Sequence, residues 1–115
     1  MEELFKALSE KVRLRMMALL LEHEMCVCEI ECVLKLTQSN ASRHLSALRK
    51  SGILESYKSA QWTYYRASEQ FKTKHTLLWE YLNTELKKPD IYPEDQAAYE
   101  RCKIKNICDC GFKPH

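Results

Sequence analysis

The chain has 115 residues, of which six are cysteine, and a formal net charge of +2. A chain of this length normally forms one domain, and its longest apolar run, residues 16–21, is far too short to cross a membrane. No secretion leader is recognisable at the start of the sequence, so we expect a cytoplasmic protein with no membrane partner. Thiols stay reduced in that compartment, which argues against a disulfide framework and for soft-metal or redox chemistry.

Two apolar helices are expected first, over residues 2–8 and 11–22. Apolar side chains recur there at helical spacing: Leu4, Phe5, Leu8, Val12, Met16, Leu19 and Leu20. A methionine in an apolar helix is usually a packing residue, so we assign Met16 and Met17 to the core and not to a metal site.

Residues 25–54 are expected to form a helix, a tight turn and a second helix. Thr37 interrupts the apolar pattern and can cap the second helix by accepting a hydrogen bond from the amide near Asn40. That helix therefore starts at Gln38. It ends before Gly52, because glycine readily adopts the left-handed conformation that terminates helices.

The second of these helices has the composition of a DNA-reading helix. Ala41, Leu45 and Leu48 form an apolar stripe, and His44 at its border is either a partly buried group or a phosphate contact. No acidic residue occurs on the opposite face, which carries side chains that can bind bases or phosphates: Gln38, Ser39, Asn40, Ser42, Arg43, Ser46, Arg49 and Lys50. The alternative is a solvated helix face.

A β-hairpin is expected next, with strands over residues 53–57 and 62–66. Lys58 and Arg66 are expected to contact DNA phosphates, while the hairpin's aromatic side chains pack across its strands. Five basic residues and one acidic residue lie within residues 37–66. This uneven charge is typical of a protein that touches a polyanion with one face.

The last third of the chain is expected to hold one long helix, residues 68–86, and a short one, residues 94–103. Leu77 and Tyr81 extend the apolar surface of the long helix beyond what one small domain needs. With the first helix as its partner, this surface predicts a homodimer, and the alternative is a core helix. Residues 106–115 are expected to be loose unless a ligand holds them.

Three motifs together resemble the ArsR/SmtB family of metal-responsive winged-helix repressors: MCVCEI at residues 25–30, LTQSNASRHLSALRKSGIL at residues 36–54 and WTYYRA at residues 62–67. The resemblance implies a mainly α-helical fold with a small β-hairpin, a winged helix-turn-helix that dimerises through its terminal helices. Two such units on a two-fold axis would bind double-stranded operator DNA. Residues 1–88 would form this domain, and residues 89–115 a cysteine-containing tail.

Two groups of cysteines are candidate metal ligands: Cys26, Cys28 and Cys32, and, as alternatives, Cys102, Cys108 and Cys110. If a helix begins near Met25, Cys28 and Cys32 lie one turn apart on one side, and Cys26 lies about 160° from Cys28. A three-thiolate site with Cys26 then requires the first turn of the helix to distort. The distortion would displace the DNA-reading helix and release the operator.

The resemblance also implies which ion binds. The family's CVC box is associated with arsenite and antimonite, and with cadmium or lead where cysteines of an N-terminal arm join the site. We expect no such arm, because Met1 directly precedes the first helix, and the family's zinc-type Asp and His pairs are missing. Family members commonly place a third cysteine three residues after the second, whereas Cys32 follows Cys28 by four. A packing role for Cys32 and a ligand role for the tail cysteines therefore stay open.

The expected function is a repressor that releases its operator when arsenite or antimonite binds cysteine thiolates, with no organic cofactor. A cadmium- or lead-responsive repressor is one alternative, and a redox sensor in which Cys26 or Cys28 is oxidised is another. A small thiol enzyme such as an arsenate reductase is disfavoured, because the chain has no CxxC pair and no Gly-rich turn.

Overall fold

The computed structural model describes residues 2–105, which form seven helices and one three-stranded sheet. In chain order the elements are α1 (Glu2–Leu8), α2 (Lys11–Leu20), β1 (Met25–Cys26), α3 (Val27–Leu34), α4 (Gln38–Lys50), β2 (Leu54–Ser59), β3 (Trp62–Ala67), α5 (Glu69–Lys74), α6 (Thr76–Glu85) and α7 (Pro93–Lys105). Within this part of the chain, no helix combines the length and the apolar run that crossing a membrane requires.

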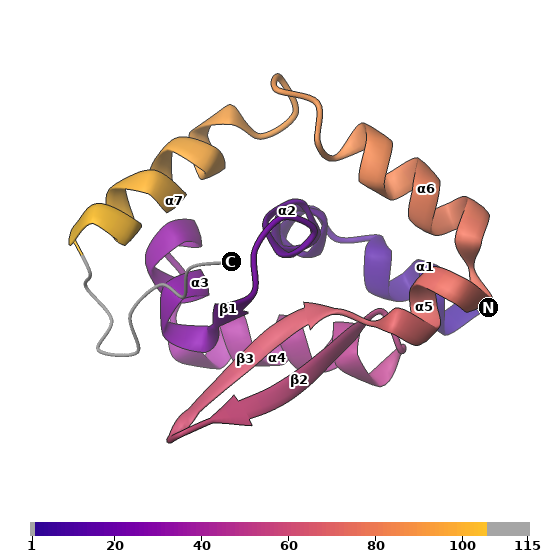
Figure 1. Ribbon diagram of the computed structural model, residues 1–115, viewed down its shortest axis with the longest axis horizontal. Helices are drawn as coiled ribbons and strands as arrows, with labels where there is room; N and C mark the ends of the chain where they lie inside the picture. Colours follow the sequence, from indigo (N-terminus) through magenta and orange to yellow (C-terminus); the bar gives the residue numbers. More distant parts are fainter. Residues whose placement is uncertain (1, 106–115) are drawn as a thin grey trace.

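Helix α2 lies at the centre of the molecule, and the other elements surround it (Figure 1). Helix α4 and the β2–β3 hairpin lie below α2 in this view, α3 lies to its left, and α6 and α7 form an arch above it. Helix α7 packs on α3 and α2, and α3 packs on α4. The arrangement is a winged helix-turn-helix with α3 and α4 as the two-helix unit and β2–β3 as the wing, as expected from the sequence.

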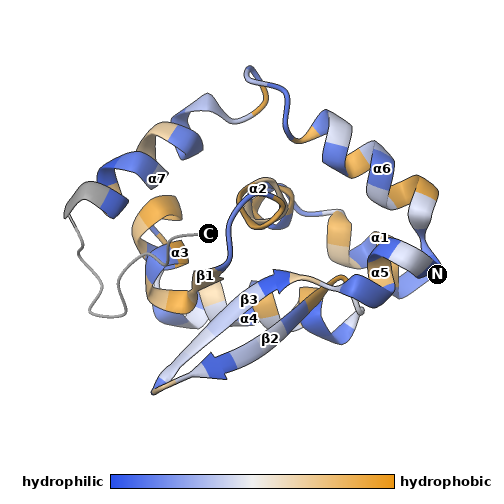
Figure 2. Ribbon diagram, in the orientation of Figure 1, coloured by the Kyte–Doolittle hydropathy of each residue, from blue (hydrophilic) through white to orange (hydrophobic). Residues whose placement is uncertain are grey.

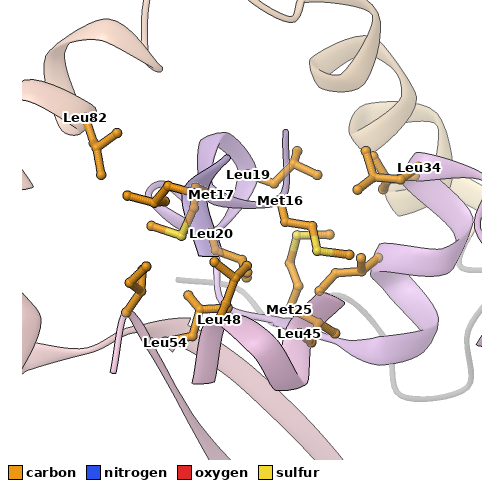
Figure 3. Packing of buried hydrophobic residues seen from close by; sticks show 14 of the residues in the cluster. Met16, Met17, Leu19, Leu20, Met25, Leu34, Leu45, Leu48, Leu54 and Leu82 are labelled. Atoms are coloured by element: carbon orange, nitrogen blue, oxygen red, sulfur yellow. The ribbon is translucent and has the colours of Figure 1, made fainter. Parts of the chain in front are cut away.

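The apolar core is built around α2, which is among the most apolar elements in Figure 2. Met16, Met17 and Leu19 have no exposed surface, so both methionines are core residues as predicted. Around them pack side chains from eight other elements, several of which are labelled in Figure 3. Full burial of one such side chain contributes roughly 1.5–3 kcal/mol, so this cluster supplies the stability on which the exposed faces of α3 and α4 depend.

The start and end of α4 agree with the sequence prediction. The Thr37 hydroxyl accepts a hydrogen bond from the Asn40 amide at 3.2 Å, and the helix begins at Gln38. After Lys50 the chain reverses through Gly52, whose φ of 87° lies in the left-handed region. Local side-chain chemistry therefore determines both ends of this helix.

The predicted hairpin is confirmed, with strands slightly longer than expected and a third strand beside them. Strands β2 and β3 pair antiparallel, and Ala60 in their turn has a φ of 56°. Met25 and Cys26 form strand β1, which pairs with Tyr65 and Tyr64 of β3. The expectation of a helix from Met25 is therefore wrong, because pairing with β3 holds these two residues extended.

The single long helix predicted over residues 68–86 is also wrong. The chain leaves the helical conformation at His75, with φ −123° and ψ 54°, and this divides it into α5 and α6. Phe71 and Trp79, on either side of the break, pack edge to face at 6.2 Å. The break lets Phe71 of α5 and Leu82 of α6 both reach the core.

Candidate thiol site and nucleic-acid interface

Two thiols meet where β1 joins α3. The sulfur atoms of Cys26 and Cys28 lie 2.9 Å apart, with Cys26 buried and Cys28 half-buried. Cys26 is the last residue of β1 and the N-cap of α3, and its ψ of 168° is extended. An extended residue followed directly by a helical turn places the two side chains on the same side of the chain.

This geometry corrects the expectation that Cys26 lies about 160° from Cys28. That angle assumed that both residues are helical, whereas α3 begins at Val27. The two sulfurs are adjacent without any distortion of the helix.

Polar side chains surround the start of α3 next to the thiol pair. The Cys26 amide donates a 2.7 Å hydrogen bond to Oε1 of Glu29, a carboxylate with no exposed surface. Burial raises the pKa of the Tyr99 phenol in α7, and the nearby charge of Glu29 raises it further. The Tyr99 ring stacks on His23 at 3.9 Å. Helix α7 thus borders the start of α3.

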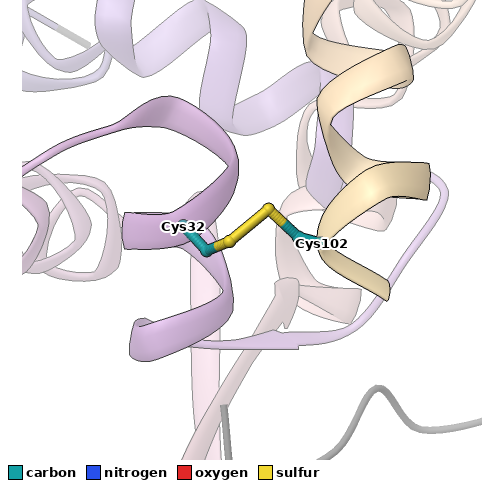
Figure 4. The surroundings of a disulfide bond; sticks show 2 residues. All are labelled: Cys32 and Cys102. Atoms are coloured by element: carbon teal, nitrogen blue, oxygen red, sulfur yellow. A yellow bond between two sulfur atoms is a disulfide. The ribbon is translucent and has the colours of Figure 1, made fainter. Parts of the chain in front are cut away.

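A disulfide joins Cys32 of α3 to Cys102 of α7 (Figure 4). Their Cα atoms are 6.4 Å apart, within the range that a disulfide spans. The expectation that the cysteines stay reduced is wrong for this pair, because the fold brings α3 and α7 side by side. Within residues 2–105, no group of three or more His, Cys, Asp or Glu side chains is placed to hold a metal ion. Cys108 and Cys110 lie outside the described residues.

The face of α4 that the sequence predicted to read DNA points away from the core. Ala41, Leu45 and Leu48 are fully buried on its other side. The predicted contact residues are exposed apart from Ser46, which is half-buried: Gln38, Ser39, Asn40, Ser42, Arg43, Arg49 and Lys50. The helix therefore offers a polar and basic surface of the kind that groove-reading helices present to DNA.

The two predicted wing contacts differ in their surroundings. Lys58 is exposed on β2. Arg66 lies 4.0 Å from Glu24 and 3.7 Å from Glu55, and its guanidinium covers the ring of Tyr57 at 4.7 Å. Arg66 thus ties the wing to the segment before β1 and faces two carboxylates.

His44 lies on the buried side of α4, with 4% of its surface exposed. Arg13 of α2 donates from Nε to its Nδ1 at 3.1 Å, and Nη2 of Arg43 lies 3.2 Å from its Nε2. The spacing of residues in α4 predicts His44 at the border of the apolar stripe but gives no indication of Arg13. No sequence signal links two residues 31 positions apart.

The chain is similar in sequence to known bacterial transcription regulators. A family model described as bacterial regulatory protein, arsR family, matches residues 10–56. The chain is 48% identical over 63 residues to the arsenic resistance transcriptional regulator ArsR1 of Pseudomonas putida, covering 54% of this chain and 49% of that protein. It is 39% identical over 62 residues to the cadmium resistance transcriptional regulatory protein CadC of Listeria innocua, covering 53% of this chain and 52% of that protein. The match thus spans about half the length of these two regulators. The chain is also 34% identical over 99 residues to an uncharacterized HTH-type transcriptional regulator, YbzH, of Bacillus subtilis, covering 73% of this chain and 96% of that protein.

Solved structures with the same fold include HlyU of Vibrio cholerae, with a TM-score of 0.57 and 36% identity over 67% of this chain and 85% of that chain. A homodimeric winged helix-turn-helix DNA-binding domain of Mycobacterium bovis has a TM-score of 0.62 and 25% identity, covering 76% of this chain and 81% of that chain.

Proposed function

Because this chain belongs to the ArsR family of bacterial transcription regulators, we propose that it represses transcription from an operator and releases the DNA when arsenite or antimonite binds Cys26 and Cys28. Proteins of this family are DNA-binding regulators and not enzymes, so the thiol-enzyme alternative is set aside. The observation that carries the proposal is the 2.9 Å separation of the two sulfurs. This separation matters because Cys26 caps α3 and Cys28 lies in its first turn. Helix α3 in turn packs on the DNA-facing helix α4.

Operator binding is proposed to use the exposed face of α4 in the major groove and Lys58 of the wing on a phosphate. Gln38 and Asn40 at the start of α4 can form paired hydrogen bonds with adenine, and Arg43 can do so with guanine. Arg49 and Lys50 at the other end suit phosphate contacts.

The inducer is proposed from the chemistry of the thiols. Thiolates select soft, thiophilic ions. Zinc–thiolate bonds are about 2.3 Å long, so two sulfurs that bind one ion of that size can be no more than about 4.6 Å apart. The observed 2.9 Å is within this distance. A third thiolate would come from Cys32 once its disulfide is reduced, or from Cys102, Cys108 or Cys110. Cadmium and lead remain the alternative ions, and the cadmium regulator among the relatives supports testing them.

Release is proposed to follow from the position of Cys26. An ion that draws the two sulfurs into its own geometry moves the end of β1 relative to the first turn of α3, where the Cys26 amide is bonded to Glu29. Because α3 packs on α4, the ion-bound state presents the DNA-facing helix differently. A ligand that prefers this state lowers the DNA-competent population by its differential affinity.

The test is fluorescence anisotropy of the reduced protein on a labelled fragment of the promoter of its own gene, titrated with arsenite. We expect release at near-stoichiometric arsenite, and we expect Cys26→Ser and Cys28→Ser to bind DNA normally without being released. Cys32→Ser, Cys102→Ser, Cys108→Ser and Cys110→Ser, measured alongside, decide which further thiol closes the site. Tight DNA binding that arsenite leaves unchanged would reject this inducer, and cadmium and lead in the same assay test the alternative.

A second candidate, a redox-sensing repressor, is favoured by the Cys32–Cys102 disulfide. The two thiols would give two protons and two electrons to a peroxide, which is reduced to two waters or to water and an alcohol, as the bond between α3 and α7 forms. DNA affinity that changes with peroxide in metal-free buffer, and no longer does so in Cys102→Ser, would support this reading. Unchanged affinity in the wild-type protein would reject it.

A homodimer is proposed through α1 and α6. Phe5 of α1 is 54% exposed, and Leu77 and Tyr81 of α6 are 83% and 64% exposed. Helices α1 and α6 lie on the same side of the molecule (Figure 1). The Mycobacterium bovis domain is described as homodimeric, and this supports testing this chain for a homodimer.

A further inference from the structure

A polar link joins the core helix α2 to the DNA-facing helix α4. The Arg13 side chain is only 12% exposed, and it contacts two groups at once. Its Nε donates to Nδ1 of His44 at 3.1 Å, and its Nη2 lies 2.7 Å from Oε2 of Glu10. On the other side of the imidazole, Nη2 of the exposed Arg43 lies 3.2 Å from Nε2.

The two arginine contacts cannot both be hydrogen bonds. A guanidinium has only donors, and a neutral imidazole has one donor nitrogen and one acceptor nitrogen. The bond from Arg13 requires Nδ1 to be the acceptor, so the proton of the neutral ring is on Nε2. That N–H faces the N–H groups of Arg43. Because two donors cannot bond to each other, the Arg43 guanidinium forms no hydrogen bond with the ring.

We propose that Arg13 and His44 are positioning residues for operator binding: Arg13 holds His44 as the Nε2–H tautomer, and this fixes α4 on α2 and turns the Arg43 guanidinium toward DNA. The inference rests on the proposed operator binding of α4. It assigns a role in DNA recognition to Arg13, a residue of α2 that lies outside the helix-turn-helix unit.

Protonation of His44 would remove the acceptor that Arg13 needs. The ring would then be a cation between two other cations, with Glu10 as the acidic group acting on it; Lys6, Glu3 and Lys50 line the adjoining surface hollow. Burial, Arg43 and Arg13 lower the pKa of His44 below 6.5, and Glu10 opposes them. The link is therefore intact at neutral pH and is lost only as the pH falls below 6.5.

The sign of the pH dependence separates this role from a phosphate contact. A positioning His44 weakens operator binding on protonation, because the link to α2 breaks. A His44 that bound phosphate would strengthen operator binding on protonation, because it would add a cation to the interface.

The experiment measures operator affinity by anisotropy between pH 5.5 and 8, and its dependence on salt, for wild-type protein and four variants. His44→Asn keeps an acceptor near the position of Nδ1 without a titrating proton, and asparagine has nearly the helix propensity of histidine. We expect it to bind like the wild type at pH 7.5 and to lack the loss at acid pH. We expect His44→Leu and Arg13→Met to bind about tenfold more weakly, and Arg13→Met to keep the wild-type salt dependence.

Lys6→Met, which removes a charge beside Arg13 without touching His44, is the matched control. If Arg13→Met does not fold, as judged by circular dichroism, Arg13→Lys replaces it, because lysine keeps the charge and loses the Nε donor. Wild-type affinity and pH dependence in His44→Leu would overturn the proposal, as would a salt slope reduced by about 0.9 in Arg13→Met. A wild-type protein that does not bind the operator would overturn the proposed function as well.

Discussion

Arg15 of α2 and Asp95 of α7 form a two-point ion pair across 80 positions of the chain. Nε and Nη2 of the guanidinium donate to Oδ2 and Oδ1 of the carboxylate, each at 2.8 Å. Nearer the end of α7, the Cys32–Cys102 disulfide joins this helix to α3. Helix α7 is therefore attached at its start to α2 and near its end to α3.

Replacing Asp95 with asparagine should weaken this attachment. The asparagine would keep the size of the side chain but lose the charge and one acceptor, while the Arg15 side chain, 27% exposed, stays in place. Hydrogen bonds to charged groups contribute roughly 1.5–3 kcal/mol when they are partly buried. We expect Asp95→Asn to lower the free energy of unfolding in urea by about 1–3 kcal/mol. Glu94→Gln, an exposed change one residue earlier, is the control and should have almost no effect.

Reduction of the disulfide should also lower stability. Cys32 and Cys102 are 70 positions apart, and closing a loop of this size stabilises a protein by about 2–4 kcal/mol. We expect a reducing agent to lower the urea midpoint of the wild-type protein, and the double variant Cys32→Ser, Cys102→Ser to be insensitive to it. A wild-type midpoint that does not move on complete reduction, verified by thiol counting, would contradict this prediction.

The parts of the fold that the sequence predicted well are those governed by neighbouring residues. Thr37 and Gly52 act within a few positions of themselves, so α4 could be placed to the residue. The apolar stripe of α4 likewise indicated which of its faces is exposed. Each of these features follows from hydrogen bonds or periodicity inside one short segment.

The parts that could not be predicted depend on distant partners. Cys26 is extended because it pairs with Tyr64 of β3, and this pairing decides that its sulfur meets that of Cys28. Cys32 meets Cys102 only because α7 folds back over α3. An error of two residues in the predicted start of α3 thus gave the wrong geometry for the thiol site. The cysteines themselves still indicated where a soft ion would bind.

The salt dependence of operator binding should separate the basic residues of the interface. Each phosphate contact contributes about 0.9 to the slope of log affinity against log salt. We expect Lys58→Ala and Arg49→Ala each to lower the slope by about this amount. Arg66→Ala should leave the slope unchanged, because Arg66 already faces Glu24 and Glu55. A lower slope in Arg66→Ala would show that this guanidinium moves to DNA on binding.

Alkaline pH should destabilise the protein through Tyr57. Its hydroxyl donates a hydrogen bond to Glu24, and burial, this bond and the carboxylate charge raise its pKa from 10.0 to about 12. Because the folded-state pKa is the higher one, stability is fully present below pH 10 and is lost as the pH rises toward 12. We expect the free energy of unfolding to fall more steeply over this range than in Tyr57→Phe. Both proteins should carry Cys26→Ser and Cys28→Ser, so that thiols do not exchange with the disulfide. Equal slopes would mean that the bond to Glu24 does not hold the phenol protonated.

The proposed dimer depends on apolar side chains that the single chain leaves in solvent. Leu77 is 83% exposed, and a glutamate at this position in a dimer interface would bury a charge without a partner. We expect the wild-type protein to have the mass of a dimer by light scattering at micromolar concentration, and Leu77→Glu to be a folded monomer. Ala97→Glu, on the exposed side of α7, should remain a dimer. Two-fold symmetry places two α4 helices about one DNA turn apart, so the monomeric variant should also lose most of its operator affinity. A wild-type monomer at this concentration would remove α1 and α6 as the interface and leave one α4 helix to account for all operator contacts.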